Sequence, residues 1–150
     1  MNHHVTLPMV PVPSKLSYPP RHSAFTQTFW NGLRSGLWQT TCCEDCSKLT
    51  FPPKPVCPHC WSTRVVWRPL GAVGTLYSWT RIHAAPAVFS TESPYAVGIV
   101  DLADGIRLAC RLTHNDDEVL TPGMPVEMLV LQYEDGPLFA ARPLLKAPQS

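Results

Sequence analysis

Four cysteines in two C-x-x-C pairs are the residues of this chain best placed to do chemistry. They are Cys43, Cys46, Cys57 and Cys60, with ten residues between the two pairs. Each C-x-x-C turn directs two thiolates at one ion, and two such turns complete the tetrahedral ligand set that zinc prefers. Because four thiolates leave no position for water, the spacing predicts one structural zinc ion per chain.

Disulfide bonds and a redox-active dithiol are the alternative interpretations of these cysteines. We find neither a secretory signal pattern nor an apolar run long enough to cross a membrane, so we expect a cytoplasmic protein, where stable disulfides are rare. A single C-x-x-C would suffice for redox work. Cys42 would form a poorer C-x3-C chelate, and Cys110 occupies an apolar position of an alternating segment, so neither is expected to bind the metal.

An amphipathic helix is expected before the cysteines, over residues 23–36. Phe25, Phe29 and Leu33 recur at a spacing of four, with Trp30 beside them, and a serine at the start and a glycine at the end can cap the helix. We expect Phe25 and Leu33 to pack on the chain itself. Trp30 is left open between packing and contact with a ligand or partner.

After the cysteines the hydrophobic period changes to two, which predicts β-strands. We expect strands over residues 73–81, 95–102, 106–113, 126–133 and 138–142, with hairpin turns at 103–105 and 134–136. Five short strands are the number of a small closed barrel such as an OB-fold. Proline supplies 17 of the 150 residues, which excludes an all-helical bundle.

The expected organisation is a series of segments of different character. They are a Pro-rich mobile arm (1–20), an amphipathic helix (21–38), a zinc ribbon (39–69), an OB-fold (70–145) and a short tail (146–150). The net charge is +5 over residues 1–69 and −4 over residues 70–150, within a formal total of +1. Such asymmetry is typical either of halves that face different partners or of a chance dipole.

Several strings in a fixed order resemble one known family. They are Phe29–Gly36, the cysteine pairs with Phe51-Pro52-Pro53-Lys54 between them, Trp67, Gly71–Thr80, Pro94-Tyr95 and Gly123–Val126. Over residues 22–143 the chain looks like the zinc-ribbon/OB-fold proteins associated with acyl-CoA enzymes. The resemblance implies a mostly β fold with an N-terminal helix, a rubredoxin-type zinc ribbon and a C-terminal five-stranded OB-fold barrel.

The same resemblance implies an accessory or scaffold subunit. Such proteins often partner thiolase-like enzymes in acyl transfer or in C–C bond formation and cleavage, or form part of aldolase and hydratase complexes. Some members bind CoA or acyl-CoA, and others mainly scaffold. This sequence departs from the family at Ser47 and Trp61, where glycine often follows the second cysteine of each knuckle. If these positions need a positive φ, both side chains are strained there.

No catalytic constellation is visible in the sequence. It contains no nucleophile elbow, no P-loop and no dinucleotide-binding glycine motif, and His83 and His114 are isolated histidines. We therefore do not expect an enzyme that works alone. We expect a hetero-oligomeric complex with no membrane contact, and a homo-oligomer is a further possibility.

Five residues are candidates for binding an acyl-CoA ligand: Trp30, Arg34, Tyr77, Trp79 and Arg81. CoA needs cations for its phosphates and an aromatic face for its adenine, and these residues supply both. The alternative for Trp79 is a core position, with Tyr77 beside it if the two share the inward face of the strand.

Two other functions compete with the acyl-CoA interpretation. Zinc ribbons and OB-folds also bind single-stranded nucleic acid through aromatic platforms in basic grooves. The charge of −4 on the barrel half argues against this alternative. A purely structural adaptor is compatible with every feature of the sequence.

Overall fold

A computed structural model describes residues 6–17, 19–89, 92, 94–115 and 117–144 of the chain. Its elements, in order, are β1 (Met9–Pro11), α1 (Gln27–Leu33), β2 (Gln39–Cys43), β3 (Leu49–Thr50), β4 (Val65–Pro69), β5 (Val73–Ile82), a 3-10 turn (Ala87–Phe89), β6 (Tyr95–Leu102), β7 (Arg107–Leu112), β8 (Pro125–Tyr133) and β9 (Gly136–Pro143). None of the described helices is long and apolar enough to span a bilayer. The predicted tail, 146–150, lies outside the described residues.

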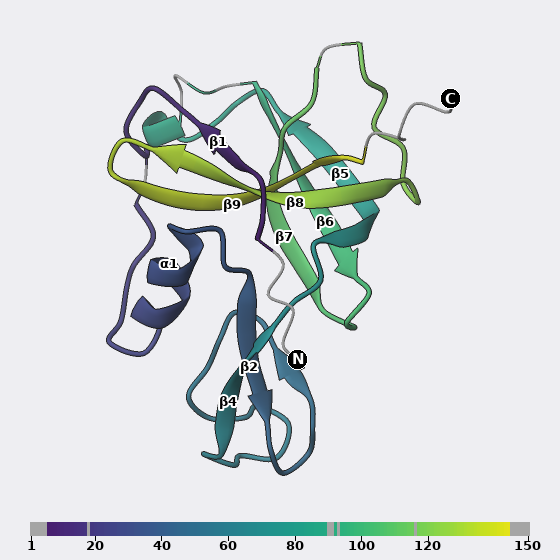
Figure 1. Ribbon diagram of the computed structural model, residues 1–150. Helices are drawn as coiled ribbons and strands as arrows, with labels where there is room; N and C mark the ends of the chain where they lie inside the picture. Colours follow the sequence, from purple (N-terminus) through teal and green to yellow (C-terminus); the bar gives the residue numbers. More distant parts are fainter. Residues whose placement is uncertain (1–5, 18, 90–91, 93, 116, 145–150) are drawn as a thin grey trace.

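Strands β5 to β9 close into a barrel, which occupies the upper part of Figure 1. The strand order is β8-β5-β6-β7-β9, and β8 pairs with β9 to complete the circle. All neighbours are antiparallel except β7 and β9, which run parallel. The expected mostly β fold with a five-stranded OB-type barrel is therefore confirmed. The observed strands agree with the predicted ones to within a few residues. The alternation of apolar residues that predicted them is an alternation of burial: Leu108, Cys110 and Leu112 all face the interior of the barrel.

The zinc ribbon is a separate three-stranded sheet in the order β3-β2-β4, at the bottom of Figure 1. β2 pairs antiparallel with both neighbours, in a register that places Cys43 opposite Val65. The cysteine pairs lie at the two turns of this sheet.

Helix α1 is shorter than predicted. Residues 24–26 form a turn, in which the Thr26 N–H donates to the Ser23 hydroxyl at 3.1 Å and the Ser23 N–H donates to the Thr26 hydroxyl at 2.8 Å. This reciprocal pair has the pattern of a capping box, and the Gln27 N–H donates to the Ser23 carbonyl at 3.0 Å, so Ser23 caps the turn that leads into the helix, as predicted. At the other end Gly36 has φ +85°, and the Leu37 N–H donates to the Gly32 carbonyl at 2.9 Å, so the predicted glycine stop is confirmed.

The N-terminal segment differs most from its prediction. Residues 9–11 form β1, which pairs parallel with β8, and the Val12 N–H donates to the Gln132 carbonyl at 2.8 Å. Leu7 is 1% exposed. The prolines do favour an extended backbone, but Leu7 is buried and Met9, Val10 and Val12 are partly buried against the core, so the prediction of a mobile arm is corrected over the described residues.

The helix, the ribbon and the barrel meet in one aromatic cluster. Phe29 of α1, Trp38, Phe51 of the ribbon and Phe139 of β9 lie with ring centroids 5.5–6.1 Å apart. Phe29 and Leu33 are buried and Phe25 stacks on Trp67 at 5.3 Å, as expected for a helix that packs on its own chain. The three parts therefore share one hydrophobic core.

Candidate metal centre and ligand-binding surfaces

The four predicted cysteines lie together at the tip of the ribbon. Their sulfur atoms all fall within 4.8 Å of one another, with Cys43 to Cys60 at 3.5 Å and Cys46 to Cys57 at 3.6 Å. A tetrahedral zinc ion with Zn–S bonds of about 2.3 Å places its sulfurs about 3.8 Å apart. The donor set and its spacing therefore fit zinc. Cys42 lies outside this cluster.

Backbone N–H groups of the knuckles donate to two of the four sulfurs, and such hydrogen bonds favour the thiolate, which is the metal-binding form of cysteine. The Cys46 N–H donates to the Cys43 sulfur at 3.4 Å, and the His59 N–H donates to the Cys57 sulfur at 3.4 Å. The hydrogen bond from Cys46 is the main cause that lowers the pKa of the Cys43 thiol to about 7. The buried Cys110, by contrast, has its pKa raised to about 12 by desolvation, as befits an inert core thiol.

Both residues that replace the usual glycines have a positive φ. The angle is 63° at Ser47 and 64° at Trp61, so the condition for strain set out from the sequence is met. The Ser47 N–H donates to the Cys43 carbonyl at 2.9 Å, and the Trp61 N–H donates to the Cys57 carbonyl at 2.9 Å. Trp61 is 79% exposed, so its ring gains little from packing within the chain.

Charged side chains surround the knuckles without reaching the sulfurs. Arg64 forms ion pairs with Asp45 at 3.0 Å and Glu44 at 3.6 Å, and Ser62 donates a hydrogen bond to Asp45. These groups tie the first knuckle to the second around the candidate metal.

A β-bulge separates the three ligand candidates on β5. The register with β6 shifts between Leu76 and Ser78, so Tyr77 faces outward while Trp79 and Arg81 face the same side as Leu76. In a regular strand all three candidates would share one face. The Trp79 Nε1–H donates to the Leu120 carbonyl at 2.9 Å, and the ring packs against the core.

Tyr77 lies on the outer face of the barrel beneath an arginine. The Arg107 guanidinium stands 3.8 Å from the centre of its ring, and Arg107 is itself paired with Asp101 at 2.6 Å. This hydrogen bond and charge hold the pKa of Asp101 below its ordinary value. Because the Asp101 carboxylate neutralises Arg107, this arginine adds no net positive charge beside Tyr77 for a nucleic-acid phosphate.

The two candidates from the helix region lie apart from each other. Trp30 stacks between His22 at 5.3 Å and Phe139 at 6.2 Å and lines an apolar cavity of about 400 Å³ where helix, ribbon and barrel meet. The other residues lining this cavity are Pro20, Arg21, Thr26, Phe29, Phe51, Pro52, Pro53 and Leu138. Arg34 lies instead against the β8–β9 hairpin, beside Tyr133 and Glu134.

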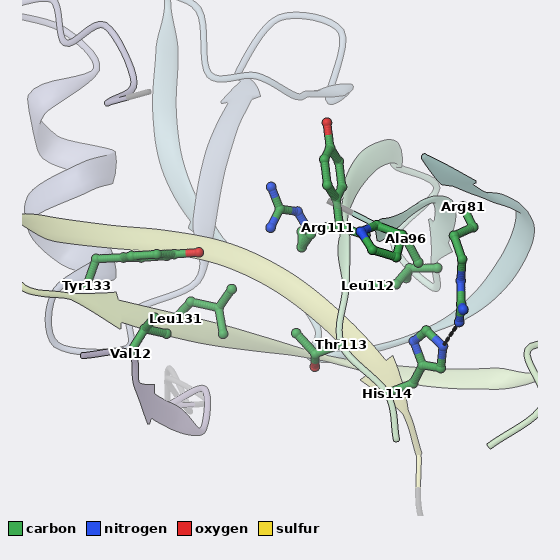
Figure 2. Close-up of a pocket in the computed structure, with 11 residues that line it drawn as sticks. Val12, Arg81, Ala96, Arg111, Leu112, Thr113, His114, Leu131 and Tyr133 are labelled. Atoms are coloured by element: carbon green, nitrogen blue, oxygen red, sulfur yellow. Dashed lines mark hydrogen bonds between the residues drawn. The ribbon is translucent and has the colours of Figure 1, made fainter. Parts of the chain in front are cut away.

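Arg81 lines a cavity of about 380 Å³ at one mouth of the barrel (Figure 2). Its guanidinium is 3.1 Å from the His114 Nε2, and Arg111 and Tyr133 line the same cavity. The structure therefore does not bring the five ligand candidates together in one site. Sequence reasoning missed His114, Arg111 and Tyr133 as cavity residues. The end of β7, which carries Arg111 and leads to His114, meets Arg81 of β5 and Tyr133 of β8 only in the folded barrel.

Family models of two adjoining domains cover most of the chain. The ChsH2 rubredoxin-like zinc ribbon domain matches residues 30–66, and the ChsH2 C-terminal OB-fold domain matches residues 67–132. A DUF35 domain-containing scaffold protein of Pyrococcus furiosus is 30% identical over 112 residues, which are 70% of this chain and 82% of that protein. The chain belongs to the DUF35 family.

Two further similar proteins are linked to enzymes by their descriptions. The 3-oxo-4,17-pregnadiene-20-carboxyl-CoA hydratase alpha subunit of Mycobacterium tuberculosis is 28% identical over 124 residues, which are 83% of this chain but only 39% of that subunit. A solved structure described as Ltp2-ChsH2(DUF35) aldolase superposes with a TM-score of 0.74 at 27% identity, covering 85% of this chain and 100% of that one.

Proposed function

We propose that this DUF35 chain is the non-catalytic scaffold subunit of an enzyme complex that acts on acyl-CoA, with a thiolase-like enzyme as its catalytic partner. The observation that carries the proposal is its likeness, along the full length of the matched chain, to the DUF35 chain of the aldolase structure. The catalytic subunit would perform the acyl transfer or the C–C bond formation or cleavage. The DUF35 chain would position that enzyme and its substrate.

The chemistry of the described residues supports a non-catalytic role. The four-cysteine cluster is the sole group of potential metal ligands found in that part of the chain, and four thiolates leave no position for a substrate or water. The thiol of Cys110 is buried and has its pKa raised to about 12, so it is protonated at neutral pH. Neither feature provides a nucleophile.

Zinc at Cys43, Cys46, Cys57 and Cys60 is proposed to hold the ribbon in shape. The spacing of the sulfurs and the hydrogen bonds to Cys43 and Cys57 support this assignment. The ion supplies folding free energy to a small sheet that has few apolar residues of its own.

The Trp30 cavity is the proposed contact with the catalytic partner. Aromatic residues in apolar pockets are frequent anchors of protein interfaces, and this cavity is formed by all three parts of the molecule. A side chain inserted there would contact the helix, the ribbon and the barrel together. The partner would thereby recognise the assembled fold.

Co-expression tests the proposal. The chain is produced with a thiolase-like, an aldolase or a hydratase subunit from the same genome, and complexes are measured by size-exclusion chromatography with light scattering. We expect a stable hetero-oligomer with the thiolase-like subunit and no turnover of acyl-CoA by the chain alone. Turnover by the purified chain would overturn the scaffold role. A complex only with the aldolase or the hydratase would correct the partner.

A further inference from the structure

We propose that the mouth of the barrel holds a phosphate-monoester site built on Arg81 and His114, separate from the metal centre and from the Trp30 cavity. Arg81, Ala96 and Leu112 are cross-strand neighbours on the inward side of β5, β6 and β7, at the end where these strands part. The resulting cavity has a volume of about 380 Å³, within the usual range of small-ligand pockets.

The cavity has two polar ends of different charge (Figure 2). At one end Arg111 is paired with Glu92 at 3.4 Å and stands 4.2 Å above the centre of the Tyr95 ring. The Tyr133 hydroxyl also donates to Glu92, at 3.5 Å. The charge of Arg111 is therefore neutralised within the protein, and this end does not attract an anion.

The other end carries the positive charge of Arg81, which forms no ion pair with any carboxylate that the structure describes. Arg64, Arg107, Arg111 and Arg142 each have a carboxylate within 4.0 Å, whereas none of the carboxylates in the described part of the chain lies that close to Arg81. The polar partner of Arg81 is the His114 ring, at 3.1 Å. An arginine held beside a histidine, with no described carboxylate within 4.0 Å of it, is suited to bind an anion.

The direction of this hydrogen bond determines what the pair offers to a ligand. Arginine only donates, so the His114 Nε2 must accept, and the proton of the neutral imidazole is on Nδ1. The remaining guanidinium N–H groups and the imidazole N–H are all donors. The adjacent Thr113 also lines the cavity. Glu118, in the neighbouring cavity beyond His114, accepts the Asn115 N–H at 2.9 Å.

Several donors and one full positive charge suit a phosphate monoester, which has three free oxygens and close to two negative charges at neutral pH. A phosphodiester of a nucleic-acid backbone has two free oxygens and one charge, and it fits less well. The lining also includes the apolar side chains of Val12, Leu112 and Leu131. The ligand class is thus an organic phosphate monoester with a partly apolar body. The expectation that CoA supplies this group rests on the proposed function.

Calorimetric titration of the full-length chain tests this inference with matched ligands. CoA carries a phosphate monoester, and dephospho-CoA lacks it. We expect CoA to bind about tenfold or more tightly than dephospho-CoA. Phenyl phosphate serves as a probe that does not depend on the CoA proposal, and its binding is followed by phosphorus NMR line broadening. An oligothymidylate without terminal phosphate tests the phosphodiester alternative.

Variants assign the binding to the barrel mouth. Arg81→Gln and His114→Gln should each weaken the binding of phenyl phosphate and of CoA about tenfold, and Arg81→Gln should abolish the preference for CoA over dephospho-CoA. Arg107→Gln removes the same charge from the outer face and should change neither. Thermal unfolding of each variant tests whether it folds. If either Arg81→Gln or His114→Gln fails to fold, the other variant still tests the site.

Three results would overturn the inference: no binding of phenyl phosphate to the wild-type chain, equal loss in Arg107→Gln and Arg81→Gln, or tighter binding of the oligothymidylate than of either monoester. If phenyl phosphate binds through Arg81 but CoA does not, the phosphate site stands and the CoA assignment fails. If no phosphate binds while the complex with a catalytic subunit still forms, the inference fails and the scaffold role is unaffected.

Discussion

The zinc ribbon and the rest of the chain hold their left-handed turns in opposite ways. Outside the ribbon the positive-φ positions of the described residues are all glycines, Gly36, Gly105 and Gly123, whereas in the ribbon they are Ser47 and Trp61. A side chain in that conformation costs about 1–2 kcal/mol. The barrel and helix avoid this cost through their sequence. The ribbon can tolerate it because two metal–thiolate bonds per knuckle would fix each turn from outside.

Burial differs between the two regions in the same sense. Strands of the barrel bury large apolar side chains completely, among them Leu76, Val100 and Met128. β2 of the ribbon buries Gln39, Thr40, Thr41 and Cys43, and β4 buries none of its residues. Apolar burial stabilises the barrel at about 25 cal/mol per Å². The ribbon has little of it, so its stability should depend on the metal.

Loss of the metal is expected to give the largest effect and to separate the two regions. Cys57→Ser removes one of four ligands, so the chain should lose its zinc, and the amides of residues 39–69 should exchange rapidly with solvent. Apparent zinc-binding free energies of structural sites are about 10–16 kcal/mol, far above the stability of such a small sheet. The amides of β5 to β8 should stay protected. Elemental analysis and hydrogen exchange by mass spectrometry provide the measurements.

Cys42→Ser is the control for ligand register, because Cys42 adjoins a ligand and lies outside the sulfur cluster. It should keep one zinc per chain. Metal loss in this variant would show that the ligand set is wrong. Absence of zinc from wild-type protein prepared without chelators would show that the four cysteines do not bind zinc.

The next largest change in stability should come from Leu7, the buried residue that precedes β1. This N-terminal segment belongs with the barrel, because β1 pairs with β8. Leu7→Ala empties a site that is 1% exposed, so the free energy of unfolding should fall by about 2–5 kcal/mol. Lys15→Ala, an exposed neighbour, should change it by less than about 0.5 kcal/mol. Urea denaturation measures both. An unchanged midpoint for Leu7→Ala would restore the mobile arm that the proline content predicts.

Features that depend on residues close together in the sequence could be predicted, and features that depend on distant residues could not. The cysteine cluster was predictable because C-x-x-C spacing fixes two ligands locally, and β7 because strict alternation places Cys110 inside. The β1 pairing was missed because the partner of Val10 is Leu131, more than a hundred residues away. The division of Tyr77 from Trp79 depends on a single-residue bulge, which leaves the hydrophobic pattern of the strand unchanged.

A Trp30 variant tests the cavity where the ribbon and the barrel meet the helix. Its expected effect, on assembly with the catalytic subunit, is smaller. Trp30→Ala should weaken assembly with the catalytic subunit by about 2 kcal/mol, roughly thirtyfold in Kd, because interface anchors of this kind lose at least that much. Zinc content and the protection of β5 to β9 should remain. Tyr77→Ala, on the outer face, should assemble normally. If Trp30→Ala instead unfolds the isolated chain, Trp30 is a core residue and the docking assignment fails.

The smallest expected effect concerns the two strained turns of the ribbon, at Ser47 and Trp61. Trp61→Gly relieves a φ of 64° and removes a side chain that is 79% exposed, so little packing is lost. Part of the gain is offset by the greater chain entropy of glycine, and the net stabilisation of the ribbon should be about 0.5–1 kcal/mol. Ser47→Gly, at the matching position of the other knuckle, should give a similar value.

Hydrogen exchange of the ribbon amides in zinc-loaded protein measures the stability change of both variants. Binding of each variant to the catalytic subunit then tests whether Trp61 or Ser47 also contributes to the interface. Strained residues persist where the surroundings over-determine them, often at functional sites. If Trp61→Gly stabilises the ribbon and weakens assembly while Ser47→Gly only stabilises it, the exposed ring is retained for the partner. If Trp61→Gly destabilises the ribbon, the indole makes a favourable contact in solution, and the contrast between metal-held and glycine-held turns is weaker than the backbone angles indicate.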